Sequence, residues 1–286
     1  MRRQKFRESA MRAVFLLCAC VSILAVALIC WFLFSSGVPA MGKIGVGSFL
    51  FGEKWKPNAN LYGILPMILG SVYATAGAIL VGVPLGLLTA VFLARFCPAR
   101  LHRTLRRAID LLAGIPSIVY GFFGLMALVP LGQLLFGGSG KSLLTASVLL
   151  GIMILPTVVS VSETALRAVP DSYYEGALAL GATHERAVFT AVLPAARSGI
   201  LAGVVLGVGR AVGETMAVIM VAGNQTAMPS GLLRGVRTLT ANIVIEMGYA
   251  TDLHREALFA TGVVLFVFIL LINLAFSCLK RKGEKK

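Results

Sequence analysis

Two opposite charges, Arg210 and Glu214, lie inside a long apolar run, within the stretch GVGRAVGETMAVIMVAGN at 207–224. A charged side chain at the centre of a bilayer costs about 2.5–3.5 kcal/mol on insertion scales, so such residues are rare there. On one continuous helix, residues four apart share a face, and each charge would shield the other from lipid. The pair is therefore either structural, or a site where Arg210 offers a planar fork of donors to an oxyanion while Glu214 holds the guanidinium.

Other polar residues could add hydrogen-bond donors to such a site. Thr215, Asn224 and Gln225 follow the pair toward one end of the run. Ser117 and Tyr120 lie beside Pro116 in a different apolar run, where a role in bending the helix is an equal alternative. The predicted substrate pathway therefore comprises Arg210, Glu214 and Thr215, with Asn224, Gln225, Ser117 and Tyr120 as further candidates.

The composition is that of a membrane protein. The chain has 286 residues, of which 58% are hydrophobic and only 13% are charged, with a mean hydropathy of +0.89. A soluble domain of this size could not cover its surface with so few charges. Runs long enough to span a bilayer recur at 13–34, within 64–94, within 111–140, and at 142–162, 198–221 and 257–279. We therefore expect an all-α integral membrane protein with six transmembrane helices.

The basic residues predict the orientation of these helices. The net charge is +14, and most lysines and arginines cluster at 2–12, 95–107, 167–197 and 280–286, which are the flanks of alternate spans. The positive-inside rule then places both termini in the cytoplasm, which agrees with an even number of spans. Nucleic-acid binding is not expected, because no basic domain with interleaved aromatic residues lies outside the membrane.

Residues that usually signal catalysis or metal binding are scattered. The five cysteines do not fall in an expected external loop, so no structural disulfide is predicted. The three histidines stand singly, without the spacing of metal ligands, and none lies within a predicted span. The stretch GGSGKS at 137–142 lacks the first glycine of a phosphate-binding loop, because Leu135 occupies that position. We expect neither an enzyme nor a metal or cofactor held by this chain.

Glycine and proline suggest how the spans are shaped and packed. Gly199, Gly203 and Gly207 recur every fourth residue, as do Gly209 and Gly213, and this spacing lets helix backbones approach closely. Gly82 and Pro84 could bend the second span, and Pro116 the third. The first span and a glycine-rich external loop (residues 1–64) are an expected addition to a membrane domain at 65–279, followed by a basic tail at 280–286.

The cytoplasmic segment at 165–199 is more than a connector. After Pro170, Asp171 or Ser172 could cap a short helix that ends at Gly181. Thr183 could cap a second helix that ends before Pro194. Two short helices joined by a glycine turn on the cytoplasmic face would suit docking to a partner.

The motif in this segment resembles the cytoplasmic loop of ABC-transporter permeases. Glu175-Gly176-Ala177, then Gly181, then Leu193-Pro194 match the pattern E-A-A-x3-G-x9-I-x-L-P in spacing, with Gly176 and Ala191 as departures. The resemblance implies that the short helix docks into a cleft of a cytosolic ATPase and transmits its closure to the membrane helices. It also implies the type I ABC importer permease fold.

Further stretches resemble the PstC type of phosphate-importer permease. These are LLAGIPSIVYGFFGL at 111–125, GRAVGETMAVIMVAGN at 209–224 and VRTLTANIVIEMG at 236–248, together with 49–57 and 62–71. The resemblance implies phosphate transport across the bacterial inner membrane with a PstA-like permease, a PstB-like ATPase dimer that binds ATP and Mg²⁺, and a periplasmic phosphate-binding protein. The alternatives are a permease for sulfate, molybdate or an organic solute, the PstA-type partner itself, or a membrane scaffold without transport.

Overall fold

A computed structural model describes residues 2–284 of the chain, and nearly all of its regular structure is helical. The helices are α1 (Arg2–Ile44), α2 (Val46–Phe51), α3 (Leu65–Val91), α4 (Ala99–Gly114), α5 (Ser117–Phe123), α6 (Val129–Phe136), α7 (Leu143–Arg167), α8 (Asp171–Ala179), α9 (His184–Ala187), α10 (Leu193–Ala195), α11 (Arg197–Gly213), α12 (Met216–Val221), α13 (Leu239–Glu246) and α14 (Asp252–Glu284). The π-helical turns η2 (Phe92–Phe96), η3 (Gly124–Leu128) and η4 (Val188–Val192) continue α3, α5 and α9.

The expected membrane spans are present. Within residues 2–284, five helices are long and apolar enough to cross a membrane, at Met11–Ile44, Leu65–Phe96, Ser117–Phe136, Leu143–Arg167 and Asp252–Ala275. A sixth span is reached only if His184–Ala195 and Arg197–Gly213 (α11), which meet at a bend of 70°, are counted as one broken span. The side chains at 2–7 and 279–286, which include many of the basic residues used to predict orientation, lie outside the described part of the structure.

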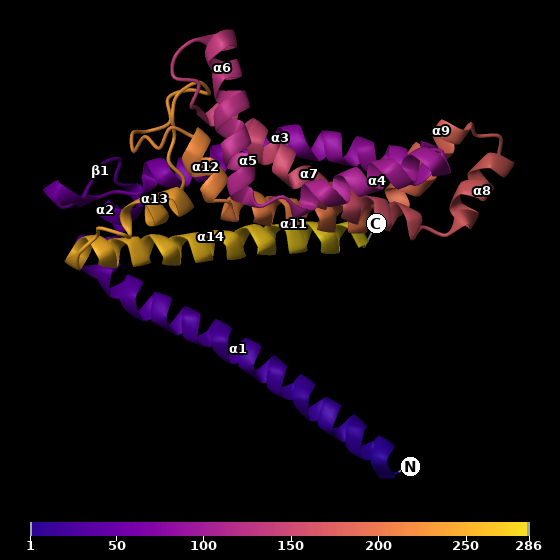
Figure 1. The fold of residues 1–286 in the computed structure, drawn as a ribbon, viewed down its shortest axis with the longest axis horizontal. Coiled ribbons are helices and arrows are strands. Elements are labelled where there is room, and N and C mark those ends of the chain that lie inside the picture. The colour runs from indigo at the N-terminus through magenta and orange to yellow at the C-terminus, as the bar shows by residue number, and fades with distance from the viewer. Residues whose placement is uncertain (1, 285–286) are drawn as a thin grey trace.

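The centre of the bundle is built from α3, α7 and α11 (Figure 1). A Cβ atom on Gly199 would lie 2.4 Å from Ala165, and one on Gly203 or Gly207 would lie about 3 Å from side chains of α7. The predicted close packing is therefore confirmed for this glycine series. Gly209 and Gly213 face open space instead, so the second series makes no such contact within the described residues. Gly82 likewise packs tightly, against Ile154, and α3 continues unbroken through it.

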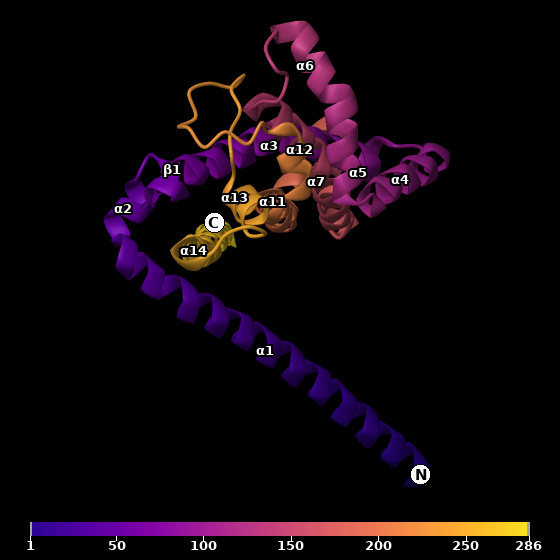
Figure 2. The same ribbon diagram turned by 60° about the vertical axis from the view of Figure 1, so that its left-hand side comes forward.

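The first helix stands apart from the bundle for most of its length, as both views show (Figures 1 and 2). Every side chain from 11 to 29 is exposed. The helix meets α14 only near its C-terminal end, through edge-to-face pairs of Phe32 with Phe259 and Phe34 with Phe266. Gly37 allows this approach, because a Cβ atom there would lie 2.7 Å from Val263.

Two sequence expectations about boundaries are wrong. The glycine-rich stretch after residue 34 is helical as far as Ile44, since packing on α14 favours the helix, and the rest forms α2 and a hairpin of β1 (Trp55–Lys56) and β2 (Leu61–Tyr62) around the 3₁₀ turn η1 (Pro57–Ala59). Pro116 does not bend the third span. It separates α4 from α5, because the residue before a proline disfavours helical geometry, and Ile115 is extended. The sequence analysis did not identify α4 as a separate helix.

Candidate functional site

The apolar run that carries Arg210 and Glu214 is two helices rather than one. Helix α11 ends at Gly213, Glu214 has an extended backbone (φ −70°, ψ 128°), and α12 begins at Met216. The expectation that Arg210 and Glu214 form an i,i+4 pair on one helix face is therefore wrong. The helical geometry needed for that pair ends one residue before Glu214, and no ion pair joins the two side chains in the described chain.

Glu214 stabilises the interruption itself. Its carboxylate accepts hydrogen bonds from the backbone N–H groups of Thr215 (3.1 Å) and Ala217 (3.2 Å), at the start of α12. A negative group at a helix N-terminus is favourable for the helix dipole as well. The Thr240 hydroxyl donates to the Glu214 carbonyl (3.2 Å), and the Thr215 hydroxyl donates to the Gly213 carbonyl (3.2 Å). Four of the backbone groups at the break thus find partners inside the protein, where a membrane offers no water.

Arg210 lies one turn before the break and is half-buried. In the part of the chain that the structure describes, its guanidinium makes no hydrogen bond and no ion pair. Its charge is close enough to Tyr120 to act on the hydroxyl of that residue. The structure therefore presents a cation, without a carboxylate partner in the described chain, beside a break in a membrane span.

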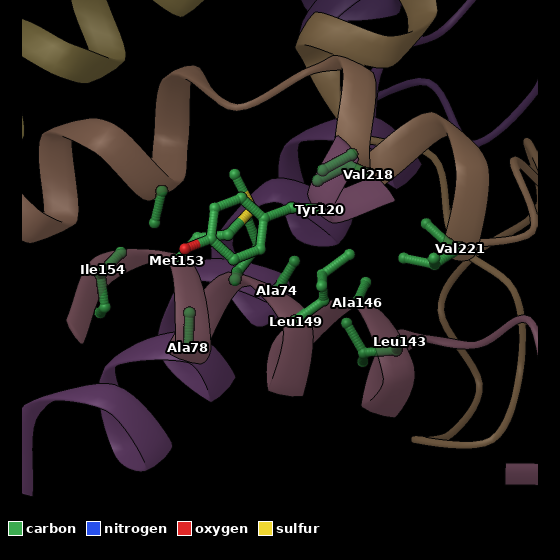
Figure 3. Close-up of a cluster of buried hydrophobic side chains, with 14 of the residues drawn as sticks. Ala74, Ala78, Tyr120, Leu143, Ala146, Leu149, Met153, Ile154, Val218 and Val221 are labelled. Atoms are coloured by element: carbon green, nitrogen blue, oxygen red, sulfur yellow. The ribbon is translucent and has the colours of Figure 1, made fainter. Parts of the chain in front are cut away.

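Tyr120 lies in the same region, but its ring is packed in the apolar core. Figure 3 shows its ring within the apolar cluster that includes Ala74, Met153 and Val218. Only 5% of the residue is exposed, and its hydroxyl donates to the Leu112 carbonyl (2.8 Å), which joins α5 to the end of α4. Ser117, the first residue of α5, is half-buried and makes no hydrogen bond within the described residues.

Asn224 and Gln225 are not brought to Arg210 by any contact in the described structure. Asn224 has a left-handed backbone (φ 51°), and its amide donates to the Ile219 carbonyl (2.7 Å), so it terminates α12. Gln225 is exposed and packs its side chain over Gly235. The geometry gives both residues a role in the turn after α12.

A buried charge network that the sequence analysis missed lies beyond this turn. The side chain of Glu246 is 7% exposed and forms an ion pair with Arg237. It also accepts a hydrogen bond from the Trp55 indole (2.8 Å) and shares one with the His254 ring (2.8 Å). Arg237 also donates to the Asn224 carbonyl (3.0 Å) and to Asn242 (3.1 Å). The network ties the hairpin, α12, α13 and α14 together. Its only signal in the sequence is a pair of opposite charges on the two flanks of a short apolar helix.

The 165–199 segment forms short helices, broadly as predicted. Gly181 has a left-handed backbone (φ 85°), and the Thr183 hydroxyl accepts from the Arg186 N–H (3.3 Å) to cap α9. Two details are wrong. Pro170 holds the cap position of α8, so Asp171 is the first helical residue, and no side chain caps that end. The second helix continues through η4 and α10 to Ala195, because Pro194 lies in the first turn of α10, where a missing N–H is tolerated.

The motif residues of this segment face outward. Glu175, Gly176 and Gly181 are exposed, and Ala177 is half-buried. Leu180 is 91% exposed and Tyr173 is 54% exposed, which leaves an apolar surface without a partner in the described chain. Leu193 is half-buried and Pro194 is exposed at the start of α10.

The same segment is anchored to the bundle on its inner side. The Tyr174 hydroxyl shares a hydrogen bond with His184 (2.7 Å), and the His184 ring packs edge-on against Phe96 at 4.6 Å. Arg95 pairs with Asp171 (3.3 Å) and donates to the Leu166 carbonyl (3.2 Å). Helix α8 and the turn after it are therefore in contact with the ends of α3 and α7.

Comparison with known proteins identifies the family. Residues 82–284 match the family described as "Binding-protein-dependent transport system inner membrane component". The chain belongs to this family. The permease is therefore a multi-pass inner-membrane protein of an ABC importer, which operates with a binding protein and an ATPase, and its family consists of transporter subunits rather than enzymes.

Named relatives cover most of the chain. A probable ABC transporter permease protein, YqgH of Bacillus subtilis (strain 168), is 39% identical over 92% of this chain and 88% of its own length. The phosphate transport system permease protein PstC of Mesorhizobium japonicum is 39% identical over 84% and 80%, respectively. A probable PstC of Methanocaldococcus jannaschii is 33% identical over 86% and 85%.

Solved structures show the same fold. The MetNI methionine ABC transporter in an inward-facing conformation gives a TM-score of 0.59 at 22% identity, over 80% of this chain and 99% of that chain. A bacterial transporter that imports the polysaccharide alginate also gives 0.59, at 15% identity over 92% and 95%. The predicted type I ABC importer permease fold is confirmed.

The buried network gives a prediction about stability. Glu246→Gln leaves the Arg237 charge without its partner in a buried site, and loss of one member of a buried pair costs about 3–5 kcal/mol. The matched control is Glu256→Gln, because Glu256 pairs with Lys43 at 2.7 Å on the surface, where a pair contributes about 0–1 kcal/mol. Chemical unfolding of both variants in detergent should show a clearly larger loss for Glu246→Gln. Equal losses would contradict a structural role for the network.

Proposed function

We propose that this permease imports inorganic phosphate across the bacterial inner membrane. Its partners are a PstA-like permease, a PstB-like ATPase dimer that binds ATP and Mg²⁺, and a periplasmic phosphate-binding protein, with both termini of this chain in the cytoplasm. The proposal is supported by relatives named phosphate transport system permease protein PstC in several bacteria, at 34–39% identity. It is also supported by the chemistry at the interrupted span.

The observation that carries the proposal is the guanidinium of Arg210. It is half-buried beside the break between α11 and α12, and within the described residues no carboxylate neutralises it. A guanidinium presents a planar fork of donors that matches the oxygens of phosphate. Interrupted helices near the middle of the membrane are where transporters commonly build their substrate sites.

Glu214 lies beside this site, and its carboxylate forms no ion pair with Arg210 within the described residues. Its carboxylate is held by the two N–H groups of α12. Its negative charge stays near the pathway and weakens the attraction for an anion, so that phosphate binds and is then released. Thr215, at the break, is the third residue of the proposed pathway, with its hydroxyl bonded to the Gly213 carbonyl.

The outward surface of α8 is the proposed contact with the ATPase. Leu180 and Tyr173 offer exposed apolar area, and Glu175 and Gly176 lie on the same short helix. The inner anchors through Arg95 and His184 would pass movement of the ATPase to α3 and α7. ATP hydrolysis by the partner is then linked to opening and closing of the pathway.

Neutralising Arg210 tests the substrate site. Arg210→Gln should reduce phosphate uptake by about 10- to 100-fold, the loss expected for a charge-assisted hydrogen bond worth about 1.5–3 kcal/mol. Arg210→Lys should also be impaired, because an ammonium group lacks the planar fork. Uptake of labelled phosphate by the reconstituted complex, with sulfate as competitor, measures both. The control is Arg255→Gln, which removes an exposed charge and should transport normally. Normal uptake by Arg210→Gln would refute the site.

A bulky residue at Gly181 tests the coupling role of the 165–199 segment. The backbone there is left-handed, and a Cβ atom would meet no neighbour within 4 Å, so any effect arises from backbone strain. Gly181→Val should weaken assembly with the ATPase or uncouple hydrolysis from uptake. Gly181→Asn is the control, because asparagine adopts this conformation far more readily than a β-branched residue. If Gly181→Val assembles and transports like the wild type, α8 and its turn are not the coupling element.

A further inference from the structure

A cluster of basic side chains lies apart from Arg210, at the end of the bundle that carries α8 and α9 (Figure 1). A cavity of about 480 Å³ opens there between η2, the start of α4 and the end of α7. Its volume is within the range of small-molecule sites, roughly 300–1,000 Å³. The basic residues that line it are Arg95, His102, Arg103, Arg106, Arg107 and Arg167.

The inner part of this cavity is already balanced by carboxylates. Glu163, whose side chain is 3% exposed, contacts His102 (2.7 Å), Arg106 (2.9 Å) and Arg167 (2.9 Å). Arg106 also pairs with Asp110, and Arg95 pairs with Asp171. These contacts hold the inner basic side chains in place, and they use the three carboxylates that lie near them.

The outer part is not balanced. Arg103 and Arg107 are exposed at the cavity, and neither has a carboxylate partner within the described residues. They are four residues apart on α4, and like charges at this spacing destabilise a helix. A bound anion would remove this repulsion. The arginines of the inner wall are therefore paired with carboxylates, whereas the two guanidinium groups at the rim have no carboxylate partner within the described residues.

Helix α4 places this rim at a membrane surface. It carries basic residues together with the exposed leucines Leu101, Leu111 and Leu112, while Leu105 packs against the bundle, a composition typical of helices that lie in the interface. The helix follows the end of a membrane span, on the side where the basic flanks predict the cytoplasm. Basic pockets between helices on this side bind phosphate-bearing headgroups.

We propose that this cavity binds a phosphate group through Arg103 and Arg107. The group comes either from an anionic phospholipid of the cytoplasmic leaflet or from free phosphate in the cytoplasm, and the chemistry of recognition is the same. Arg95 and Arg167 line the same cavity and also donate to the carbonyls of Leu166 and Leu93, at the ends of α7 and α3. Occupancy therefore stabilises the junction to which α8 is anchored. This site is separate from Arg210 and does not depend on the transported substrate.

The test uses the full-length chain in neutral detergent, with Arg210→Gln as the background so that phosphate binding at the pathway does not contribute. Thermal unfolding midpoints (Tm) are measured during titration with phosphatidylglycerol, with inorganic phosphate, and with phosphatidylcholine as the neutral lipid. Arg103→Gln and Arg107→Gln are compared with Arg100→Gln. Arg100 is an exposed arginine on the same helix that does not line the cavity, so the charge removed is identical.

The proposal predicts that phosphatidylglycerol or phosphate raises Tm in the background chain and in Arg100→Gln, with phosphatidylcholine inactive. The probe concentration for half the effect should rise at least about tenfold in Arg103→Gln and Arg107→Gln, as for loss of one charge-assisted hydrogen bond. A response to phosphatidylglycerol alone identifies a lipid site, and a response to inorganic phosphate identifies a soluble ligand. Should a glutamine variant fail to fold, the lysine variant at the same position keeps the charge and should retain part of the response. No response to either probe, or equal responses in all three variants, would overturn the proposal.

Discussion

The backbone of a membrane protein must satisfy its own polar groups, because the bilayer core offers no water. This constraint explains the break between α11 and α12. A span can stop in the middle of the membrane only if the freed N–H and C=O groups find partners. Here the Glu214 carboxylate takes two N–H groups and the Thr240 hydroxyl takes a carbonyl. The acidic residue is thus a structural requirement of the interruption, and this leaves Arg210 available.

Two further buried carboxylates, near opposite ends of the bundle, also bind several polar side chains each. Glu246 holds Arg237 and His254 at one end of the bundle, and Glu163 holds His102, Arg106 and Arg167 at the other. Each of these buried acids contacts basic side chains from two separate segments. Between these two clusters, α3, α7 and α11 pack through glycine and small side chains. Buried charge contacts therefore hold the permease together at both ends, while Arg210 at the interrupted span and Arg103 and Arg107 at the cavity rim have no carboxylate partner within the described residues.

Local chemistry made much of this predictable from the sequence. Apolar length predicted the spans, glycine at every fourth position predicted the packing of α11 on α7, and Gly181 and Thr183 predicted the turn and cap beside α9. The break at Glu214 was missed because i,i+4 spacing is favourable on a helix, and the contact with Thr240, 26 residues along the chain, cannot be read from local spacing. The Glu246 network and the role of α4 were missed for the same reason. Trp55 and Glu246 are 191 residues apart, and Arg106 and Glu163 are 57 apart, and single-sequence periodicity carries no information about contacts at such separations.

The central claim is that Glu214 caps α12 and does not neutralise Arg210. A double-mutant cycle of Arg210→Gln, Glu214→Gln and the combined variant tests it most directly, with protein abundance and phosphate uptake measured for each. The structure predicts independent effects. Glu214→Gln should lower abundance by weakening the cap, Arg210→Gln should lower uptake in an assembled complex, and the combined variant should show both losses. If the combined variant instead regains abundance and uptake together, the two charges form a structural pair, and Arg210 is not the phosphate site.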